Sequence, residues 1–191
     1  ILIEGKTVKI KGPKDAIKAG IGFCPEDRKE QGLVLGRSIR DNLTMPILRT
    51  ISGGGVIDSG KEKKLSAKAI EQYRIKTHSD KKIVRELSGG NQQKVILGRW
   101  MLANLKVLIL DEPTKGIDVG AKAEIYQMVC DLAKKGLGVI FISSDLPEVL
   151  NVCDNVVVMH EGKVTGELGK NELSEELIMQ LAMVDDSGLL G

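Results

Sequence analysis

Hydrophobic and polar residues alternate at the start of the chain and then give way to short apolar runs. Residues 1–11 alternate around Glu4-Gly5-Lys6, a pattern that predicts a two-stranded ribbon closed by a turn. The segment Pro13–Ala19 predicts a short helix, and Ile21–Cys24 predicts a short buried strand that Pro25 ends. The first 25 residues therefore predict alternating strands and helices.

The middle of the chain is more polar and favours helices. Residues 30–104 carry two helical patterns, at 61–73 and at 89–102, separated from the preceding residues by the glycine-rich break at 52–55. The second predicted helix places its apolar residues on one side. Those residues are Val95, Ile96, Trp100 and Met101.

After residue 104, apolar runs and helical patterns alternate in the order expected of a parallel α/β core. The predicted elements are a strand at 106–110, a helix at 121–135, a strand at 138–143, a short helix from Pro147 and a strand at 155–159. Glu161-Gly162-Lys163 predicts a turn into a last short strand. A final helix is predicted at 172–183, followed by a frayed tail at 184–191.

Composition narrows the possible functions. The 191 residues can bury a full core and predict one domain with lobes. A net charge of +2 and 3% aromatic residues argue against a nucleic-acid partner, because few bases could stack on the chain. The three cysteines lack CxxC spacing and are expected to be reduced and buried. No apolar run approaches the ~20 residues of a membrane-spanning helix, so any membrane would be spanned by another chain.

Two motifs carry candidate phosphate chemistry in a fixed order. Ser-Gly-Gly at 88–90 opens the helix predicted at 89–102, where backbone N–H groups and the positive helix end suit a γ-phosphate. The apolar strand then ends at Asp111-Glu112, which offers one carboxylate for a hydrated Mg²⁺ and the next to polarise water. Helix capping would explain Ser88 alone but not the whole set of residues. The two motifs together indicate an ATPase.

A phosphate loop of the GxxxxGK[ST] type should precede such motifs, and two segments resemble it in part. Gly5-Lys6-Thr7 has the expected ending, but the residues after it continue as a strand rather than a helix. Residues 55–61 have the spacing, yet Glu62 stands where Ser or Thr would hold Mg²⁺, and a loop into a surface helix is the preferred interpretation. The chain also begins without Met in a strand-like pattern, so it is expected to be a fragment that lacks the phosphate-loop segment.

With these motifs in place, the chain resembles the ATPase subunits of ABC transporters. More narrowly, it resembles the C-terminal ATPase half of the tandem-cassette subunits of bacterial monosaccharide importers, the ribose and galactose class. The resemblance runs from about residue 1 to 183 and rests on the segments at 25–29 (Pro-Glu-Asp-Arg-Lys), 32–35, 87–94, 107–114, 115–122 and 142–149.

The resemblance implies an α/β fold of the P-loop NTPase class, with a parallel sheet and a helical signature subdomain but without the phosphate-loop portion. It implies one truncated ABC ATPase domain with three parts. Residues 1–30 and 105–170 would form the α/β core, residues 31–104 the helical subdomain, and residues 171–191 the C-terminal helix and tail.

The resemblance also implies residue roles and the cofactors ATP and Mg²⁺. Signature residues would contact ATP held by an opposing cassette, and these are Ser88, Gly89, Gly90 and Gln92. Asp111 would support the Mg²⁺ shell, Glu112 would polarise the attacking water, and Asp118 would lie in a loop that communicates between two sites.

Two positions depart from the commonest family pattern. Glu26 stands where a γ-phosphate-sensing Gln is usual; it could ligate Mg²⁺, or it could be a solvated acid in a turn. Ser144 stands where a catalytic switch His is usual, and it could bind a phosphate without supplying a cation, or simply cap a loop. If functional, these departures imply that the site on this half is slow or mainly structural.

The resemblance implies a second ABC cassette and transmembrane permease subunits as partners, and indirectly a sugar-binding protein, with no nucleic acid. Residues 35–50 would receive the coupling helix of the permease at the cytoplasmic face of the bacterial inner membrane. Two alternatives remain open: a non-catalytic module that lends its signature motif to a partner cassette, and a non-transport ABC ATPase. The second would be expected to carry long heptad arms or basic extensions, which these residues lack.

Overall fold

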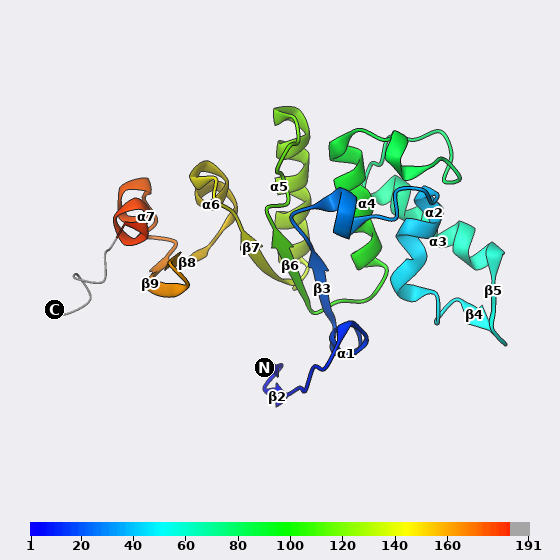
Figure 1. The fold of residues 1–191 in the computed structure, drawn as a ribbon, viewed down its shortest axis with the longest axis horizontal. Helices are drawn as coiled ribbons and strands as arrows, with labels where there is room; N and C mark the ends of the chain where they lie inside the picture. Colours follow the sequence, from blue (N-terminus) through cyan, green and yellow to red (C-terminus); the bar gives the residue numbers. More distant parts are fainter. Residues whose placement is uncertain (184–191) are drawn as a thin grey trace. The chain divides into compact units, whose positions relative to one another are not determined.

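The structure is a computed structural model that describes residues 1–183 (Figure 1). The chain forms two compact units that divide after Ile142. None of the helices within the described residues is long and apolar enough to cross a membrane. The lobe boundaries implied by the family resemblance stay a prediction.

The first unit is organised around a three-stranded parallel sheet. Its strands are β3 (Ile21–Cys24), β6 (Val107–Asp111) and β7 (Gly138–Ile142), in the order β3-β6-β7. The register pairs Cys24 with Leu110. The strands predicted at 21–24, 106–110 and 138–143 are therefore confirmed, as is their parallel arrangement.

Three helices of this unit pack around the sheet. They are α1 (Pro13–Ala19), α4 (Gly89–Met101) and α5 (Val119–Lys134), each close to its predicted span. The middle of α4 is fully buried, and its residues Val95, Ile96 and Leu97 have no exposed surface. Near its end, Trp100 donates a hydrogen bond from Nε1 to the carbonyl of Phe23 over 2.8 Å, which ties α4 to β3.

The segment between β3 and α4 is mostly helical. It contains a single π-helical turn at Arg28–Gly32, helix α2 (Ile39–Thr44), a 3-10 turn at Met45–Ile47, helix α3 (Ser59–Gln72) and a 3-10 turn at Val84–Glu86. A small hairpin of β4 (Ser52–Gly53) and β5 (Val56–Ile57) precedes α3. The helix predicted at 61–73 is confirmed, whereas α2 and the hairpin were not predicted.

The N-terminal ribbon is confirmed as an antiparallel pair, β1 (Leu2–Ile3) and β2 (Lys6–Thr7). Its turn uses positive backbone φ angles, 50° at Glu4 and 73° at Gly5. The second strand ends at Thr7, earlier than the alternation up to residue 11 suggested.

The second unit contains α6 (Leu146–Val152), β8 (Asn155–His160), β9 (Lys163–Gly169) and α7 (Glu175–Ala182). The expectation that the strand at 155–159 continues the parallel order was wrong, because β8 pairs antiparallel with β9 in a separate two-stranded sheet. The β8–β9 turn falls at Glu161 and Gly162, as predicted. The core of this unit comprises Val149, Val158, Leu168 and Ile178. The tail predicted at 184–191 lies outside the described residues.

All three cysteines are free thiols, as expected. Cys24 is fully buried at the end of β3, but the expectation of burial was wrong for Cys130 and Cys153, which are half-buried. Burial raises the pKa of the Cys24 thiol to about 11. Cys24 is therefore a protonated core residue at neutral pH and a poor nucleophile.

Candidate functional site

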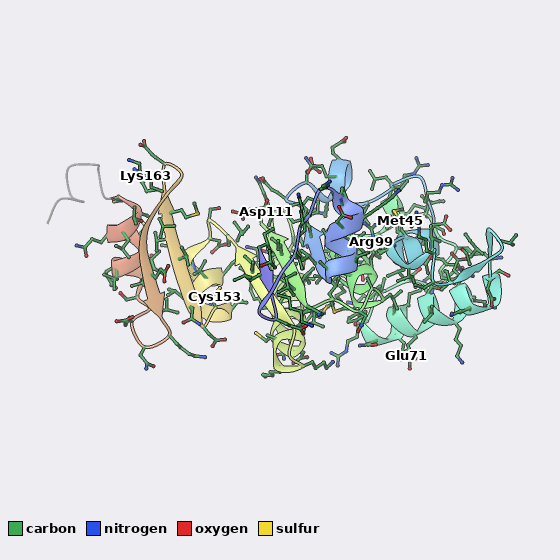
Figure 2. All side chains as sticks on the ribbon, turned by 90° about the horizontal axis from the view of Figure 1, so that it is seen from below. Met45, Glu71, Arg99, Asp111, Cys153 and Lys163 are labelled. Atoms are coloured by element: carbon green, nitrogen blue, oxygen red, sulfur yellow. The ribbon has the colours of Figure 1, made fainter. Side chains whose placement is uncertain are left out.

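The carboxyl ends of β3, β6 and β7 meet at one edge of the parallel sheet. Asp111 is the last residue of β6 and is half-buried (Figure 2). Glu112 follows with a positive φ of 44°, and its backbone N–H donates to the carbonyl of Ile142 over 2.9 Å. A non-glycine residue in this backbone region costs about 1–3 kcal/mol and persists where the surrounding structure holds it. The sheet therefore holds the two adjacent carboxylates in a strained turn at its edge.

Glu26 lies at the same edge, in the loop after β3. Its carboxylate accepts a hydrogen bond from Lys115, which lies in the loop after β6, and the two side chains form an ion pair. The hydrogen bond to Glu26 raises the pKa of Lys115. Both side chains are largely exposed, so solvent screens the pair and its main effect is to link the two loops. Sequence reasoning did not identify Lys115 as a partner of Glu26.

Asp111 and Glu26 are the acidic residues expected to bind Mg²⁺ at this edge of the sheet. Within residues 1–183, no group of three or more His, Cys, Asp or Glu side chains could hold a metal ion. Mg²⁺ usually keeps several waters and takes one or two carboxylates together with phosphate oxygens, so a protein cage is not required. Asp111 fits that arrangement as a single ligand. Glu26 fits less well because Lys115 already occupies its carboxylate.

The signature residues lie at the start of α4. Ser88 occupies the N-cap position, but its side chain makes no capping hydrogen bond to the helix backbone. Its Oγ instead accepts a hydrogen bond from Asn91 Nδ2 over 2.9 Å. The helix-capping alternative for Ser88 is thus not what the structure shows. The first N–H groups of α4 lack intrahelical acceptors by geometry, as at any helix start.

Close packing requires glycine at Gly90, and Gly89 lies against the mobile end of the Arg28 side chain. A Cβ on Gly90 would lie 2.6 Å from Cβ of Ala121, at the start of α5. A Cβ on Gly89 would lie 2.9 Å from Nη2 of Arg28. The glycines therefore allow the starts of α4 and α5, and the Arg28 side chain, to approach one another.

Gln92 is placed differently from its signature neighbours. It is buried, and its Nε2 donates to the carbonyl of Val84 over 3.3 Å. Its Oε1 is buried without a hydrogen-bond partner. The side chain thus points into the protein, whereas Ser88 is exposed.

A cavity of about 280 Å³ joins the starts of α4 and α5. It brings together three of the predicted site residues, Ser88, Gly90 and Asp118. Asp118 caps α5 by accepting a hydrogen bond from the N–H of Ala121 over 3.0 Å. The remaining lining residues are Lys76, Asn91, Lys94, Gly120, Ala121 and Glu124.

An ion pair forms part of the cavity lining. Lys94 of α4 donates to the Glu124 carboxylate of α5 and to the carbonyl of Arg74 over 3.2 Å. The Lys94 side chain is 4% exposed and that of Glu124 is 47% exposed. The hydrogen bond from Lys94 lowers the pKa of Glu124. Neither Glu124 nor Asn91 was predicted as a site residue, because their place beside Ser88 depends on helix packing.

Ser144 belongs to the second unit, just before α6. Beside it, Ser143 Oγ accepts a hydrogen bond from the Asp145 N–H over 3.1 Å and lies 3.1 Å from Glu148 Oε2, to which it donates. Glu148 is buried in α6. The loop that carries Ser144 is therefore fixed to α6 by its neighbour.

Neither segment that resembles a phosphate loop forms one. Gly5-Lys6-Thr7 lies in the β1–β2 hairpin. Residues 55–61 run through β5 into α3, where Asp58 caps the helix by accepting from the Lys61 N–H. Glu62 is buried and accepts a hydrogen bond from Thr44 Oγ1 over 2.9 Å. The strand–loop–helix geometry of a phosphate loop is absent from both segments, as expected.

Comparison with known proteins decides the family. The family model described as ABC transporter matches residues 1–115, more than half of the chain. The chain belongs to the ABC transporter family. Among solved structures, a nucleotide-free ATP-binding cassette from an ABC transporter aligns with a TM-score of 0.73 and 25% identity, over 95% of this chain and 76% of that one. The expected ABC ATPase fold of the P-loop NTPase class is confirmed.

The similar curated ABC proteins are named for sugar import. The ribose import ATP-binding protein of Lactococcus lactis subsp. cremoris is 50% identical over 182 residues, which are 95% of this chain and 37% of that protein. The arabinose import ATP-binding protein of Pectobacterium atrosepticum is 47% identical over 185 residues, 96% of this chain and 36% of that protein. This ABC chain therefore spans little more than a third of the length of these relatives.

Proposed function

We propose that this chain is an ATP-binding and ATP-hydrolysing cassette that couples energy to the import of a monosaccharide. The observation that carries the proposal is the 50% identity, over 182 residues, to a ribose import ATP-binding protein. An arabinose import protein is nearly as similar, at 47% identity. A ribose and an arabinose protein match almost equally well, so the similarity favours a class of monosaccharides rather than one sugar.

In this proposal, the cavity beside Ser88 receives the γ-phosphate of ATP that an opposing cassette holds. The signature offers an exposed hydroxyl at Ser88 and the N–H groups at the start of α4. The positive end of a helix favours a phosphate at this position. Asp118 lies on the same cavity and would transmit the state of one site to the other.

The edge of the sheet would perform the hydrolytic step on nucleotide bound to this cassette. Asp111 would hold Mg²⁺ through its hydration shell, and Glu112 would orient and polarise the attacking water. When bound, Mg²⁺ would neutralise charge on the phosphates. The strained backbone at Glu112 and its hydrogen bond to β7 support a fixed direction for this carboxylate.

The partners in this proposal are a second ABC cassette and the transmembrane permease subunits, and indirectly a sugar-binding protein. The chain would work as a peripheral subunit at the cytoplasmic face of the bacterial inner membrane. The segment at 35–50 would receive the permease. Met45, in the 3-10 turn after α2, is 37% exposed and offers an apolar contact there (Figure 2).

A second candidate function is a non-catalytic cassette that lends its signature to a partner without hydrolysing ATP itself. The ion pair between Glu26 and Lys115 favours it, because it engages the carboxylate of the residue that stands where the family usually has a γ-phosphate-sensing Gln. Ser144 also supplies no cation for the transition state. We therefore propose that the site on this half is slower than its counterpart.

The substitution Glu112→Gln in the intact transporter tests the proposal. Gln keeps the shape of the side chain and removes its charge, and loss of a general base typically slows the affected step by ~10²–10⁴-fold. With two unlike sites, transport and ATP hydrolysis should fall only in part. The equivalent change in the other cassette should abolish transport. Glu86→Gln, on an exposed turn before the signature, is the matched control.

Two results would change this account. Unchanged ATP hydrolysis and uptake in Glu112→Gln would favour the non-catalytic candidate. Complete loss, with folding and assembly intact, would show that this half is a full catalytic partner despite Ser144.

A further inference from the structure

Arg28 lies where three segments of the proposed catalytic region meet. The turn that presents it begins at Asp27, whose Oδ1 accepts hydrogen bonds from the N–H groups of Lys29 at 2.9 Å and Glu30 at 3.0 Å. The hydrogen bond from the Glu30 N–H, and after it the one from the Lys29 N–H, lowers the pKa of the Asp27 carboxyl group. The carboxylate that organises the turn is therefore charged at neutral pH.

The Arg28 guanidinium reaches the loop after β6, 87 residues further along the chain. Its Nη1 donates to the carbonyl of Lys115 over 2.6 Å, and its Nη2 donates to the carbonyl of Gly116 over 3.2 Å. Two parallel bonds to successive carbonyls require the rigid fork of an arginine, which a lysine cannot reproduce. Nη2 also lies against Gly89, where an added Cβ would come within 2.9 Å of it.

The carbonyls that Arg28 holds belong to the turn that carries Glu112. The N–H of Lys115 donates to the carbonyl of Glu112 over 3.1 Å, which closes the turn. Gly116 has a φ of 65°, a conformation that suits glycine. The Lys115 side chain is tied to Glu26 by the ion pair described above. The loop after β3 thus grips the Glu112 turn through both Arg28 and Glu26.

The placement of Arg28 leaves one donor unsatisfied. Its Nε is buried and has no hydrogen-bond partner. A buried donor without an acceptor costs stability, so an arrangement that satisfied all five N–H groups would be more favourable for folding alone. The Arg28 side chain instead donates its hydrogen bonds to the two carbonyls of the Glu112 turn.

We propose that Arg28 is a positioning residue for ATP hydrolysis: by holding the Lys115 and Gly116 carbonyls, it fixes the turn that aims the Glu112 carboxylate at water. The inference rests on the proposed hydrolytic role of Glu112. It adds a residue that acts through the backbone carbonyls of Lys115 and Gly116. Contact with Gly89 further links this turn to the start of the signature helix.

The first experiment measures, without ATP, whether Arg28 restrains the turn at Lys115 and Gly116. Trypsin cleaves after Lys115 only if it can bind the Lys115 carbonyl, which Arg28 Nη1 occupies. In the intact subunit, Arg28→Ala should raise the cleavage rate at the Lys115–Gly116 bond by about tenfold, because local opening becomes easier. Arg28→Lys should give an intermediate rate. Lys29→Ala removes an exposed neighbouring charge and should leave the rate unchanged.

The second experiment asks whether Arg28 acts through Glu112. In the intact transporter, Arg28→Ala should lower kcat for MgATP hydrolysis in part, by no more than Glu112→Gln does, while KM stays unchanged, because misplacing a catalytic group costs rate rather than binding. The double variant Arg28→Ala with Glu112→Gln should be no slower than Glu112→Gln alone. Residues that act as one unit are not additive, whereas independent effects multiply.

The two experiments distinguish failure of the positioning role of Arg28 from failure of the hydrolytic role of Glu112. An unchanged cleavage rate in Arg28→Ala would contradict the claim that Arg28 restrains the turn at Lys115 and Gly116. Faster cleavage with unchanged kcat, or multiplicative losses in the double variant, overturns the positioning role. If Glu112→Gln itself leaves kcat unchanged, the hydrolytic role of Glu112 fails and the positioning role fails with it, while the cleavage result still tells whether Arg28 holds the turn.

Discussion

Arg99 of α4 donates two hydrogen bonds to Asn42 of α2. Its Nε donates to the Asn42 carbonyl over 2.7 Å, and its Nη2 donates to Asn42 Oδ1 over 2.9 Å. Nη1 donates to the carbonyl of Gly32 over 2.6 Å, so the guanidinium also holds the end of the turn after β3. All three acceptors are neutral, and burial lowers the pKa of Arg99 to about 10. At neutral pH a buried cation therefore connects α4 to two parts of the segment between β3 and α4.

Replacing Arg99 should destabilise the protein strongly. Arg99→Ala leaves the carbonyls of Gly32 and Asn42 buried without donors and opens a cavity, and we expect a loss of about 2–4 kcal/mol in the free energy of unfolding. Arg99→Lys keeps the charge but reaches fewer acceptors, so it should lose less. Urea unfolding measures both. The exposed Arg85 gives the control, since Arg85→Ala should change stability by less than about 0.5 kcal/mol. Equal effects at Arg99 and Arg85 would show that this network is unimportant.

A second network predicts how stability depends on pH. Burial by itself raises the pKa of Asp80, but hydrogen bonds from Arg40 and Ser66 outweigh it and the net pKa is lowered from 3.8. The bonds measure 2.7 Å from Arg40 Nε and 2.9 Å from Ser66 Oγ. A lowered pKa in the folded state means that the unfolded chain binds the proton more readily. The contribution of Asp80 is thus complete above the unfolded pKa and lost as pH falls through the folded value.

Asp80→Asn should therefore destabilise the protein at neutral pH and lose that effect in acid. The difference in urea midpoint between wild type and variant should be largest near about pH 7 and shrink below about pH 3.8. Glu71→Gln, on the exposed surface of α3, is the matched control (Figure 2). A difference that stays constant from neutral pH to acid would mean that the Asp80 charge is not what stabilises this network.

The 191-residue chain alone should bind MgATP weakly and hydrolyse little or none. A phosphate loop supplies a backbone cradle and a lysine for the β- and γ-phosphates. Neither similar segment can do so, because one is a hairpin and the other packs Glu62 against Thr44. Isothermal titration calorimetry of the chain with MgATP measures the affinity. Micromolar binding that Lys61→Ala abolishes would contradict both the prediction and the assignment of residues 55–61 to a surface hairpin and helix.

Elements with a strong local signal could be predicted from the sequence. Pro13 at a helix start and the apolar run before Asp111 each identify their element without help from distant residues. The short helix α2 has a local start signal in the capping box of Ser38 and Asp41, but its six residues show no apolar periodicity long enough to predict a helix. It depends on Asn42, a buried polar residue whose side-chain amide donates to the carbonyls of Val34 and Ser38.

The same distinction applies to the candidate site. Ser88, Asp111 and Glu112 could be identified because each motif is continuous in sequence. The contacts of Glu26 and Arg28 with residues 115 and 116 could not, because they join loops 87–89 residues apart after two strands pair. The pairing of β8 was mispredicted for a related reason: an apolar run indicates a strand but not its neighbour.

We propose that Ser88 faces a γ-phosphate when two cassettes close, and ATP-driven monosaccharide uptake by the intact transporter carrying Ser88→Arg tests this most directly. A bulky cation at Ser88 would fill the cavity between α4 and α5 and block closure. Uptake should fall to background while protein level and assembly stay normal. Ser59→Arg, at the exposed start of α3, should transport as wild type does. Uptake that survives Ser88→Arg at the wild-type rate would contradict the account.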